Sequence, residues 1–259
     1  MPRINVVTGA ASGIGLATKR LLEQRGESVI GVDIRDADVL VDLTSPGDRE
    51  RMVDEVKSRS GGSIDTIIAV AGLAAPIPAT AGVNHFGMVA TLDGLRPLLA
   101  GSDSPRAVGV GSFAGTGPTD KALLAAFRAD DEPSALARAT ALAADPATEG
   151  LIYPSSKAAF AQWIRRSATA GRWAGASIPL NAIAPGVVST PLMSEALSSP
   201  AGREVIAASV PMPLNGFADA QVPARLLAWL VSHENSHLCG QVIFVDGGGE
   251  ALVRGDSVW

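Results

Sequence analysis

Cysteine is almost absent from this chain of 259 residues: Cys239 is the only one, so no disulfide can form within the chain. No stretch of about 18 consecutive apolar residues occurs, which argues against a membrane-spanning helix. The N-terminus runs directly into Ile4, without the basic segment and apolar core of a secretion signal. These absences predict a cytoplasmic protein in which Cys239 is a small packed residue.

Positive charge is also scarce. The 21 Lys and Arg residues stand against 26 Asp and Glu, the net charge is −5, and no basic run gathers the cations. Nucleic acid is therefore not an expected partner. His233 and His237 are four residues apart, but they lie in a polar, turn-like stretch that does not suggest a metal site. We expect no metal.

Linkers rich in proline or serine are lacking too, so the 47% hydrophobic content indicates one domain over residues 1–259. Short runs rich in Val and Ile alternate with segments of helical period, as in βαβ units with a buried parallel sheet. The predicted fold is a doubly wound α/β (Rossmann) domain with ligands at the carboxyl ends of its strands. The expected strands are 4–8, 29–33, 39–43, 64–71, 107–111, 180–184 and 242–245, and the helices include 14–25 and 153–170.

A glycine-rich turn, Thr8-Gly9-Ala10-Ala11-Ser12-Gly13-Ile14-Gly15, follows the first strand and opens a helix. Glycines allow positive φ and close backbone approach, and the N–H groups at a helix N-terminus favour a pyrophosphate. Asp33 ends the second strand about 20 residues on, where a carboxylate accepts hydrogen bonds from ribose hydroxyls. The pattern predicts a dinucleotide site.

Asp33 also indicates which dinucleotide binds, because its carboxylate would repel a ribose 2′-phosphate. Neither Ala11 nor Ser12 in the glycine loop supplies a compensating cation. NAD is therefore favoured over NADP. Arg35 could turn toward a phosphate, but we expect it to be solvated or to pair with a nearby acid such as Asp36 or Asp38.

Tyr153 and Lys157 stand at i and i+4 of a predicted helix, so they share one face. Tyr153 is the only tyrosine, and Lys157 is one of four lysines. A cation at about 4 Å, with an effective dielectric constant of about 20, is worth about 4 kcal/mol, which would lower the pKa of the phenol toward neutrality. This pair predicts general acid–base chemistry at Tyr153.

With these motifs, with Asn181-Ala182-Ile183-Ala184-Pro185-Gly186 and with Val245-Asp246-Gly247-Gly248, nearly the whole chain resembles the short-chain dehydrogenase/reductase family. The resemblance implies a catalytic set in which Ser112 hydrogen-bonds the substrate oxygen, Tyr153 moves the proton and Lys157 holds the nicotinamide ribose. It also implies that Asn84 completes the set through a water-linked proton relay. The residues that it places around NAD are Gly9, Ser12, Gly13, Ile14, Gly15, Asp33, Ile34, Asp42, Leu43, Ala71, Gly72, Tyr153, Lys157, Pro185, Gly186, Val188 and Thr190.

The sequence departs from the family pattern in two places. Ala69-Val70-Ala71-Gly72 stands where the family often has Asn-Asn-Ala-Gly, so an asparagine that braces the central sheet is missing. Ser112 and Tyr153 are also 41 residues apart, and the surplus indicates a helical pair inserted at about 118–148, with helices at 119–129 and 135–144. We expect this insertion to carry exposed apolar faces beside the site, as a subunit interface or a substrate lid.

The insertion, the segment Val32-Asp33-Ile34-Arg35-Asp36-Ala37-Asp38-Val39 and the C-terminal motif together resemble the bacterial 3α-hydroxysteroid dehydrogenase/carbonyl reductase branch. This resemblance implies a homo-oligomer, dimer or tetramer, and a bulky hydrophobic ketone or secondary alcohol. Segment 187–217 agrees, because it carries Leu192, Met193, Leu197, Val210, Met212 and Leu214 with Arg203 as its only cation. The alternative for these residues is packing on the core. For function, the alternatives are an aryl-alcohol dehydrogenase of the coniferyl-alcohol type and a non-enzymatic NAD(H) sensor.

Overall fold

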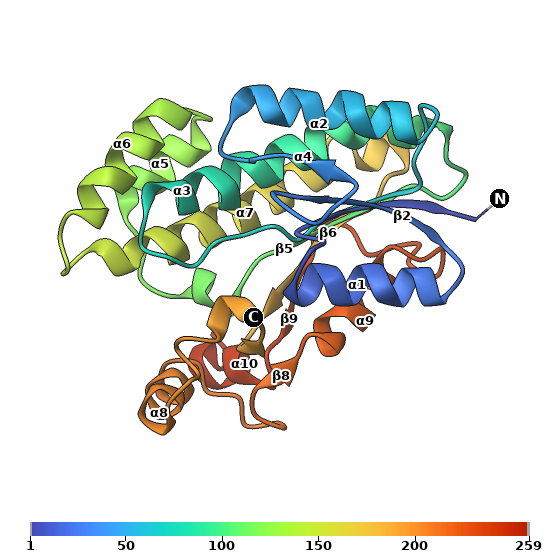
Figure 1. The fold of residues 1–259 in the computed structure, drawn as a ribbon. Helices are drawn as coiled ribbons and strands as arrows, with labels where there is room; N and C mark the ends of the chain where they lie inside the picture. Colours follow the sequence, from blue (N-terminus) through green and yellow to red (C-terminus); the bar gives the residue numbers. More distant parts are fainter. Residues whose placement is uncertain (1, 258–259) are drawn as a thin grey trace.

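Seven parallel strands pair in the order β3-β2-β1-β4-β5-β6-β9 in the computed structural model, which describes residues 2–257 (Figure 1). The strand order reverses at β1, which pairs with β2 on one side and β4 on the other. In such sheets ligands bind outside the carboxyl ends of the strands at the reversal point. The strands are β1 Ile4–Thr8, β2 Ser28–Asp33, β3 Val39–Leu40, β4 Thr66–Ala69, β5 Arg106–Val110, β6 Leu180–Pro185 and β9 Val242–Val245.

Helices cover both faces of the sheet, so the predicted doubly wound fold is confirmed. Figure 1 shows α2, α4 and α7 on one side of the sheet and α1 with α9 on the other. Right-handed crossovers between parallel strands produce this arrangement. These helices are α1 Gly13–Gln24, α2 Pro46–Arg59, α4 Met88–Leu95, α7 Ile152–Ala168 and α9 Gln221–Leu230.

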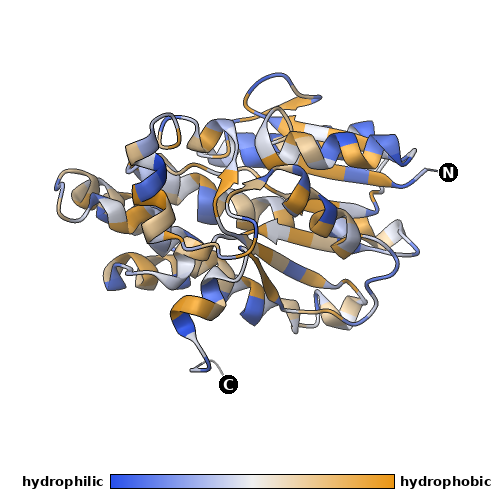
Figure 2. Ribbon diagram, turned by 90° about the horizontal axis from the view of Figure 1, so that it is seen from below, coloured by the Kyte–Doolittle hydropathy of each residue, from blue (hydrophilic) through white to orange (hydrophobic). Residues whose placement is uncertain are grey.

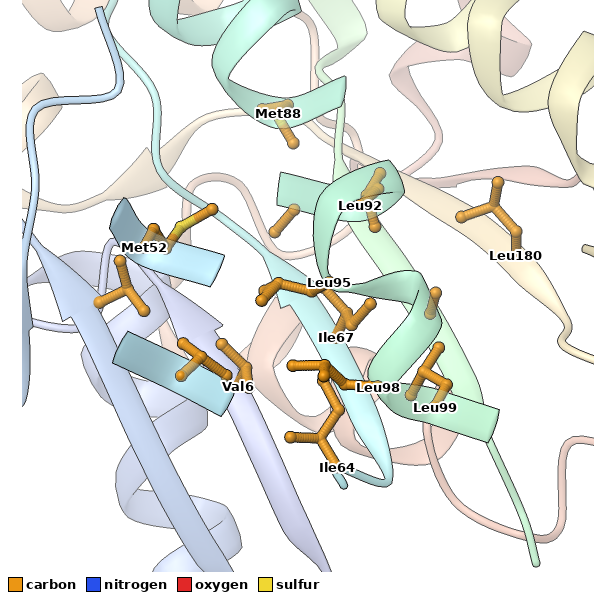
Figure 3. Close-up of a cluster of buried hydrophobic side chains, with 14 of the residues drawn as sticks. Val6, Met52, Ile64, Ile67, Met88, Leu92, Leu95, Leu98, Leu99 and Leu180 are labelled. Atoms are coloured by element: carbon orange, nitrogen blue, oxygen red, sulfur yellow. The ribbon is translucent and has the colours of Figure 1, made fainter. Parts of the chain in front are cut away.

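Each face of the sheet buries its own apolar cluster. Figure 3 shows the larger cluster, in which Val6 and Ile67 of the sheet meet Met52 of α2 and Leu92 of α4. All four side chains are fully buried. The central strands are coloured mostly as hydrophobic in Figure 2, as expected for strands covered on both faces.

Two strands are shorter than the sequence predicts, and side-chain hydrogen bonds explain where each of them ends. β3 ends at Leu40: the Val41 N–H still donates to the Asp33 carbonyl of β2 (2.9 Å), but the Asp42 N–H donates to the Asp48 carboxylate at 2.8 Å. β4 ends at Ala69 because the next two N–H groups donate to the Thr8 hydroxyl, at 2.9 and 3.1 Å. Thr8 thus links the ends of β1 and β4, near the position of the missing asparagine.

The insertion consists of two helices, α5 Lys121–Arg128 and α6 Glu132–Ala143, as predicted between the fifth strand and the helix that carries Tyr153. The expectation of exposed apolar faces is wrong. Leu123 and Phe127 of α5 and Leu142 of α6 are buried in a cluster with Phe86 and Ile152. The chain therefore covers this apolar face itself, and the homo-oligomer stays a prediction.

A lobe follows β6 at the carboxyl edge of the sheet (Figure 1). It starts from a short ladder of β7 Val188–Ser189 with β8 Ala218–Asp219, and it carries α8 Pro200–Ser209, none of whose residues is buried. The C-terminal helix α10 Gly249–Arg254 lies beside it (Figure 1). Within residues 2–257 no helix combines the length and the hydropathy needed to cross a membrane.

Candidate active site

A cavity of about 780 Å³ opens at the carboxyl edge of the sheet. Every residue that the sequence places around the cofactor lines it, and so do Ser112, Tyr153 and Lys157. Asn84 does not line it. The structure therefore joins the glycine loop and the Tyr–Lys pair in one continuous space, although about 140 residues separate them in the chain.

The glycine loop between β1 and α1 has a backbone that side chains would disrupt. Gly9 and Gly13 have φ values of +68° and +52°, in the left-handed region that favours glycine. A Cβ on Gly15 would lie 2.0 Å from the Gly9 carbonyl oxygen, so α1 can approach the loop only because Gly15 has no side chain. Ser12, the N-cap of α1, makes no side-chain capping bond. The first N–H groups of α1 are therefore available for an anionic group.

Asp33 lies at the end of β2 and faces the loop. Its carboxylate accepts hydrogen bonds from the N–H groups of Ala11 (3.0 Å) and Ile34 (2.7 Å). Arg35 lines the cavity nearby, and no ion pair to it occurs within residues 2–257. Asp38, one of its expected partners, instead pairs with Lys19 at 3.5 Å. Of the two expected alternatives for Arg35, solvation or pairing with a nearby acid, its exposed side chain follows the first.

The Tyr–Lys pair lies on α7 beside the end of β5. Lys157 is buried, and its Nζ donates a hydrogen bond to the Val110 carbonyl at 2.9 Å. The same Nζ lies 5.9 Å from the centre of the Tyr153 ring. Ser112 follows β5, and its hydroxyl accepts a hydrogen bond from the Ala114 N–H at 3.1 Å, which fixes its side chain toward the cavity. Three chemically active groups therefore converge at one end of the cavity.

The predicted lowering of the Tyr153 pKa is wrong for the chain without a cofactor. Burial raises the pKa of Tyr153 above its usual value of 10, and a hydrogen bond with Ser112 lowers it by less. The ammonium of Lys157 is held by Val110 and does not offset the burial. A cation about 4 Å from the phenol would lower its pKa, but here the ammonium of Lys157 donates to a backbone carbonyl.

Burial lowers the pKa of Lys157 from 10.5 to about 8. Between these values the unfolded chain binds more protons than the folded chain, so the Lys157 contribution to the free energy of unfolding rises with pH. We expect this rise between pH 8 and about pH 9.5 in wild type, and its absence from Lys157→Met. Urea unfolding at both pH values measures the difference, and Tyr153, whose pKa is raised, stays protonated throughout. Equal pH slopes for the two proteins would contradict a buried amine of low pKa.

Asn84 lies in a π-helical turn, Gly82–Gly87, just before α4. Its amide is fully paired: it exchanges two hydrogen bonds with the Leu73 backbone, each 2.8 Å, and donates one to the Ser156 hydroxyl at 3.1 Å. A Cβ on Gly72 would lie 3.1 Å from Asn84 Oδ1 and 3.5 Å from Lys157 Nζ. Asn84 therefore stands behind the cavity wall near Lys157, and its part in a water-linked relay stays a prediction.

The end of the cavity beyond Ser112 is apolar. The lobe contributes Leu192, Met193, Ile206 and Val210, and Phe113 lies among the residues on the other side. Leu192, Met193 and Val210 are apolar residues that the sequence predicts here, whereas Ile206, which lines the cavity from α8, is not among the predicted residues. Leu197 is buried and Met212 contacts the backbone at Gly186 and Val187, so these two follow the alternative of packing on the core.

Charged side chains are few in the cavity: Asp33, Arg35 and Asp42 at the glycine-loop end, and Lys157. Arg203, the one cation of the lobe segment, donates to the Leu197 carbonyl at 2.9 Å and does not line the cavity. Across residues 2–257 no three His, Cys, Asp or Glu side chains are grouped to hold a metal ion. The apolar end therefore offers hydroxyl groups but no clamp for a carboxylate or a phosphate.

His85 packs within the protein, as predicted from its position beside Asn84. Its ring lies 4.5 Å from that of Phe127, and burial lowers its pKa to about 4. Phe86 completes the aromatic group. His85 does not line the cavity and takes no part in the candidate site.

Comparison with known proteins places the chain among oxidoreductases. A family model described as enoyl-(acyl carrier protein) reductase matches residues 121–250. The chain is 36% identical to the 3-alpha-hydroxysteroid dehydrogenase/carbonyl reductase of Comamonas testosteroni, over 97% of this chain and 98% of that protein. It is 31% identical to the cis-4-hydroxycyclohexanecarboxylate dehydrogenase of Sinomonas cyclohexanicum, over 96% and 97% of the two chains.

A solved structure shares both fold and sequence. The 3-alpha-hydroxysteroid dehydrogenase from Pseudomonas sp. B-0831, complexed with NADH, superimposes with a TM-score of 0.87. It is 38% identical in sequence, and the match covers 98% of this chain and 99% of that one. The insertion and the lobe are therefore part of an architecture that at least one solved relative shares along almost its full length.

Proposed function

Because the chain belongs to the short-chain dehydrogenase/reductase family, we propose that it interconverts a secondary alcohol and a ketone on a hydrophobic substrate with NAD(H). One observation carries the proposal: a single cavity joins the glycine loop and Asp33 to Ser112, Tyr153 and Lys157. The glycine loop and Asp33 would hold the cofactor, and Ser112, Tyr153 and Lys157 would carry out the proton transfer.

The residues present fit a dinucleotide. Gly15 lets α1 pack directly against the Gly9 carbonyl, and no side chain caps the N–H groups at the start of α1, which suits a pyrophosphate. The Asp33 carboxylate lines the cavity where ribose hydroxyls would donate to it. When bound, the nicotinamide accepts or supplies a hydride.

The chain itself handles the proton and the substrate oxygen. The Ser112 hydroxyl would donate a hydrogen bond to the carbonyl or alcohol oxygen and hold it beside Tyr153. The Tyr153 phenol would give its proton in ketone reduction and recover it in alcohol oxidation. Lys157, with a pKa of about 8, would supply a positive charge beside the phenol once its ammonium turns from Val110 toward a bound ribose.

The substrate is proposed from the apolar end of the cavity. Leu192, Met193 and Val210 would cover an apolar body, and no cation of the lobe reaches it. A 3α-hydroxysteroid or the matching ketone is the first candidate, because the two relatives of highest identity described above carry that activity in their names. The insertion lines no part of the cavity, so the lobe rather than the insertion would be the lid.

Cofactor choice gives a specific prediction at Asp33. We expect kcat/KM for NADPH to fall at least about tenfold below that for NADH, which corresponds to about 1.4 kcal/mol of repulsion between carboxylate and 2′-phosphate. Asp33→Asn removes the charge and keeps an oxygen for the Ala11 N–H, so it should narrow this ratio. The matched control is Asp36→Asn, at an exposed position with φ of +50° that Asn also tolerates. A ratio unchanged in Asp33→Asn would contradict the role of the carboxylate.

The function is tested by following reduced-nicotinamide absorbance with NAD and NADP offered separately. The panel contains hydroxysteroids, aryl alcohols and small secondary alcohols. Turnover of a hydroxysteroid with NAD supports the proposal, and a preference for aryl alcohols keeps the mechanism but transfers the substrate to the coniferyl-alcohol type. Tight cofactor binding with no turnover on the panel would contradict an enzyme of this class and favour an NAD(H) sensor.

A further inference from the structure

One ion pair connects the insertion to the part of the chain that forms the nucleotide end of the cavity. Glu132, in the first turn of α6, accepts a hydrogen bond from each terminal nitrogen of Arg49 on α2. Nη1 donates to Oε2 at 2.7 Å, and Nη2 donates to Oε1 at 2.6 Å. Arg49 is only 8% exposed. A two-bond pair of this kind fixes the plane of the guanidinium as well as its position.

The same guanidinium holds the cavity wall. Arg49 Nε donates to the Leu43 carbonyl at 2.6 Å, and Nη2 also approaches the Thr44 carbonyl at 3.5 Å. Leu43 and Thr44 both line the cavity beside Asp42, and the Val41 N–H donates to the Asp33 carbonyl at 2.9 Å, which ties this wall to the Asp33 end of the cavity. Glu132 lines no part of it. The Glu132 carboxylate therefore affects the cavity wall only through its ion pair with Arg49.

Leu43 has little freedom on its other side. A Cβ on Gly87 would lie 2.9 Å from Leu43 Cβ, so the loop after β3 packs directly against the π-helical turn. If Arg49 rotates, the Leu43 carbonyl loses its donor while its side chain is still confined. A small rotation of the Arg49 guanidinium would therefore shift the backbone of Leu43 in the cavity wall.

We propose that Glu132 is a positioning residue for the cofactor: it orients Arg49, which fixes the Leu43–Thr44 wall against which the adenosine half of the dinucleotide binds. This inference rests on the proposed function. It assigns the insertion a role within the chain, as a support for the nucleotide end of the cavity. Loss of the carboxylate leaves the buried Arg49 with backbone carbonyls only, so the side chain moves toward water.

The catalytic end is attached to the insertion by different residues. The Asp120 N–H donates to the Ser155 hydroxyl of α7 at 2.9 Å, and the Asp120 carboxylate pairs with Arg138 at 2.6 Å. These contacts do not involve Glu132. A change at Glu132 should therefore affect the nucleotide end and leave the proton-transfer groups in place.

The test compares Glu132→Gln with the matched control Glu50→Gln, an exposed neighbour of Arg49 on α2. Titration with NADH and with ADP-ribose, which lacks the nicotinamide, measures the nucleotide end directly. We expect both Kd values to rise about fivefold, the effect of one net hydrogen bond, with kcat and the KM for the ketone within about twofold of wild type. Glu50→Gln should match wild type throughout.

Unchanged Kd values in folded Glu132→Gln would overturn the proposal. A rise in the KM for the ketone as large as the rise in the Kd values would also overturn it. Circular dichroism checks that the variant is folded, and Glu132→Asp, which keeps the charge but is one methylene shorter, replaces it if Glu132→Gln does not fold. The same criteria then apply. If wild type binds neither NADH nor ADP-ribose, the proposed function fails together with this inference, whereas binding by wild type with no change in the variant overturns the inference alone.

Discussion

Tyr153→Phe should lower kcat for ketone reduction by a factor of about 10² to 10⁴, the usual contribution of a positioned general acid. The substitution removes the hydroxyl and keeps the ring, so the packing of α7 and the Kd for NADH should change by less than about twofold. Steady-state reduction of the best ketone from the panel measures the first quantity, and fluorescence titration measures the second. Turnover within about threefold of wild type would mean that the proton comes from another group.

The same residue offers a direct spectroscopic check. Tyr153 is the only tyrosine in the sequence, so tyrosinate absorbance reports its ionisation without interference from other phenols. Burial raises its pKa above 10 in the chain without a cofactor. Binding of NAD, which brings a positive charge toward the phenol, should shift this titration to lower pH.

The second large effect is expected at Gly15. Gly15→Ala places a Cβ 2.0 Å from the Gly9 carbonyl oxygen, and the neighbours in conflict are backbone atoms that cannot rotate away. We expect a destabilisation of about 3 kcal/mol, as for other overpacked sites, and therefore a fall in Tm of roughly 6–12 °C. Because α1 must move away from the loop, the Kd for NADH should rise more than about tenfold. Thermal unfolding and NADH titration measure the two quantities.

Gly47→Ala is the matched control for this change. Gly47 lies in the first turn of α2 and has no positive φ, and a Cβ built on it would meet no atom within 4 Å apart from its chain neighbours and the nearby backbone of α2. Alanine is the better helix former there, so stability should be unchanged or slightly higher. If Gly15→Ala behaved like Gly47→Ala, the close approach of α1 to the glycine loop would be wrong.

Local patterns predicted the fold well because each strand and its following turn carry their own signal. β1 and β9 have the predicted bounds, and the glycine loop and the Tyr–Lys pair lie where their spacing placed them. Errors at β3 and β4 arose at side chains that take backbone N–H groups out of the ladder, Asp48 for β3 and Thr8 for β4. The Thr8 hydroxyl accepts a hydrogen bond from the backbone more than 60 positions away, and such a long-range contact leaves no local sequence pattern.

The less predictable part of the site depends on long-range packing. An amphipathic period in α5 shows that one face is apolar, but not that Phe86 and Ile152 of the same chain cover it. The i, i+4 spacing places Lys157 near Tyr153, but not with its ammonium on the Val110 carbonyl. The Arg49–Glu132 pair joins residues 83 positions apart, and no local sequence pattern indicates it.

The proposed function requires that hydride would pass directly between a bound nicotinamide and the substrate carbonyl carbon. The most direct test incubates the protein with a hydrophobic ketone and NADH carrying two deuterium atoms at C4, and analyses the alcohol by mass spectrometry. We expect one deuterium on the carbinol carbon in wild type and almost no alcohol from Tyr153→Phe over the same time. Alcohol formed without deuterium, or formed equally by the variant, would contradict the proposed function.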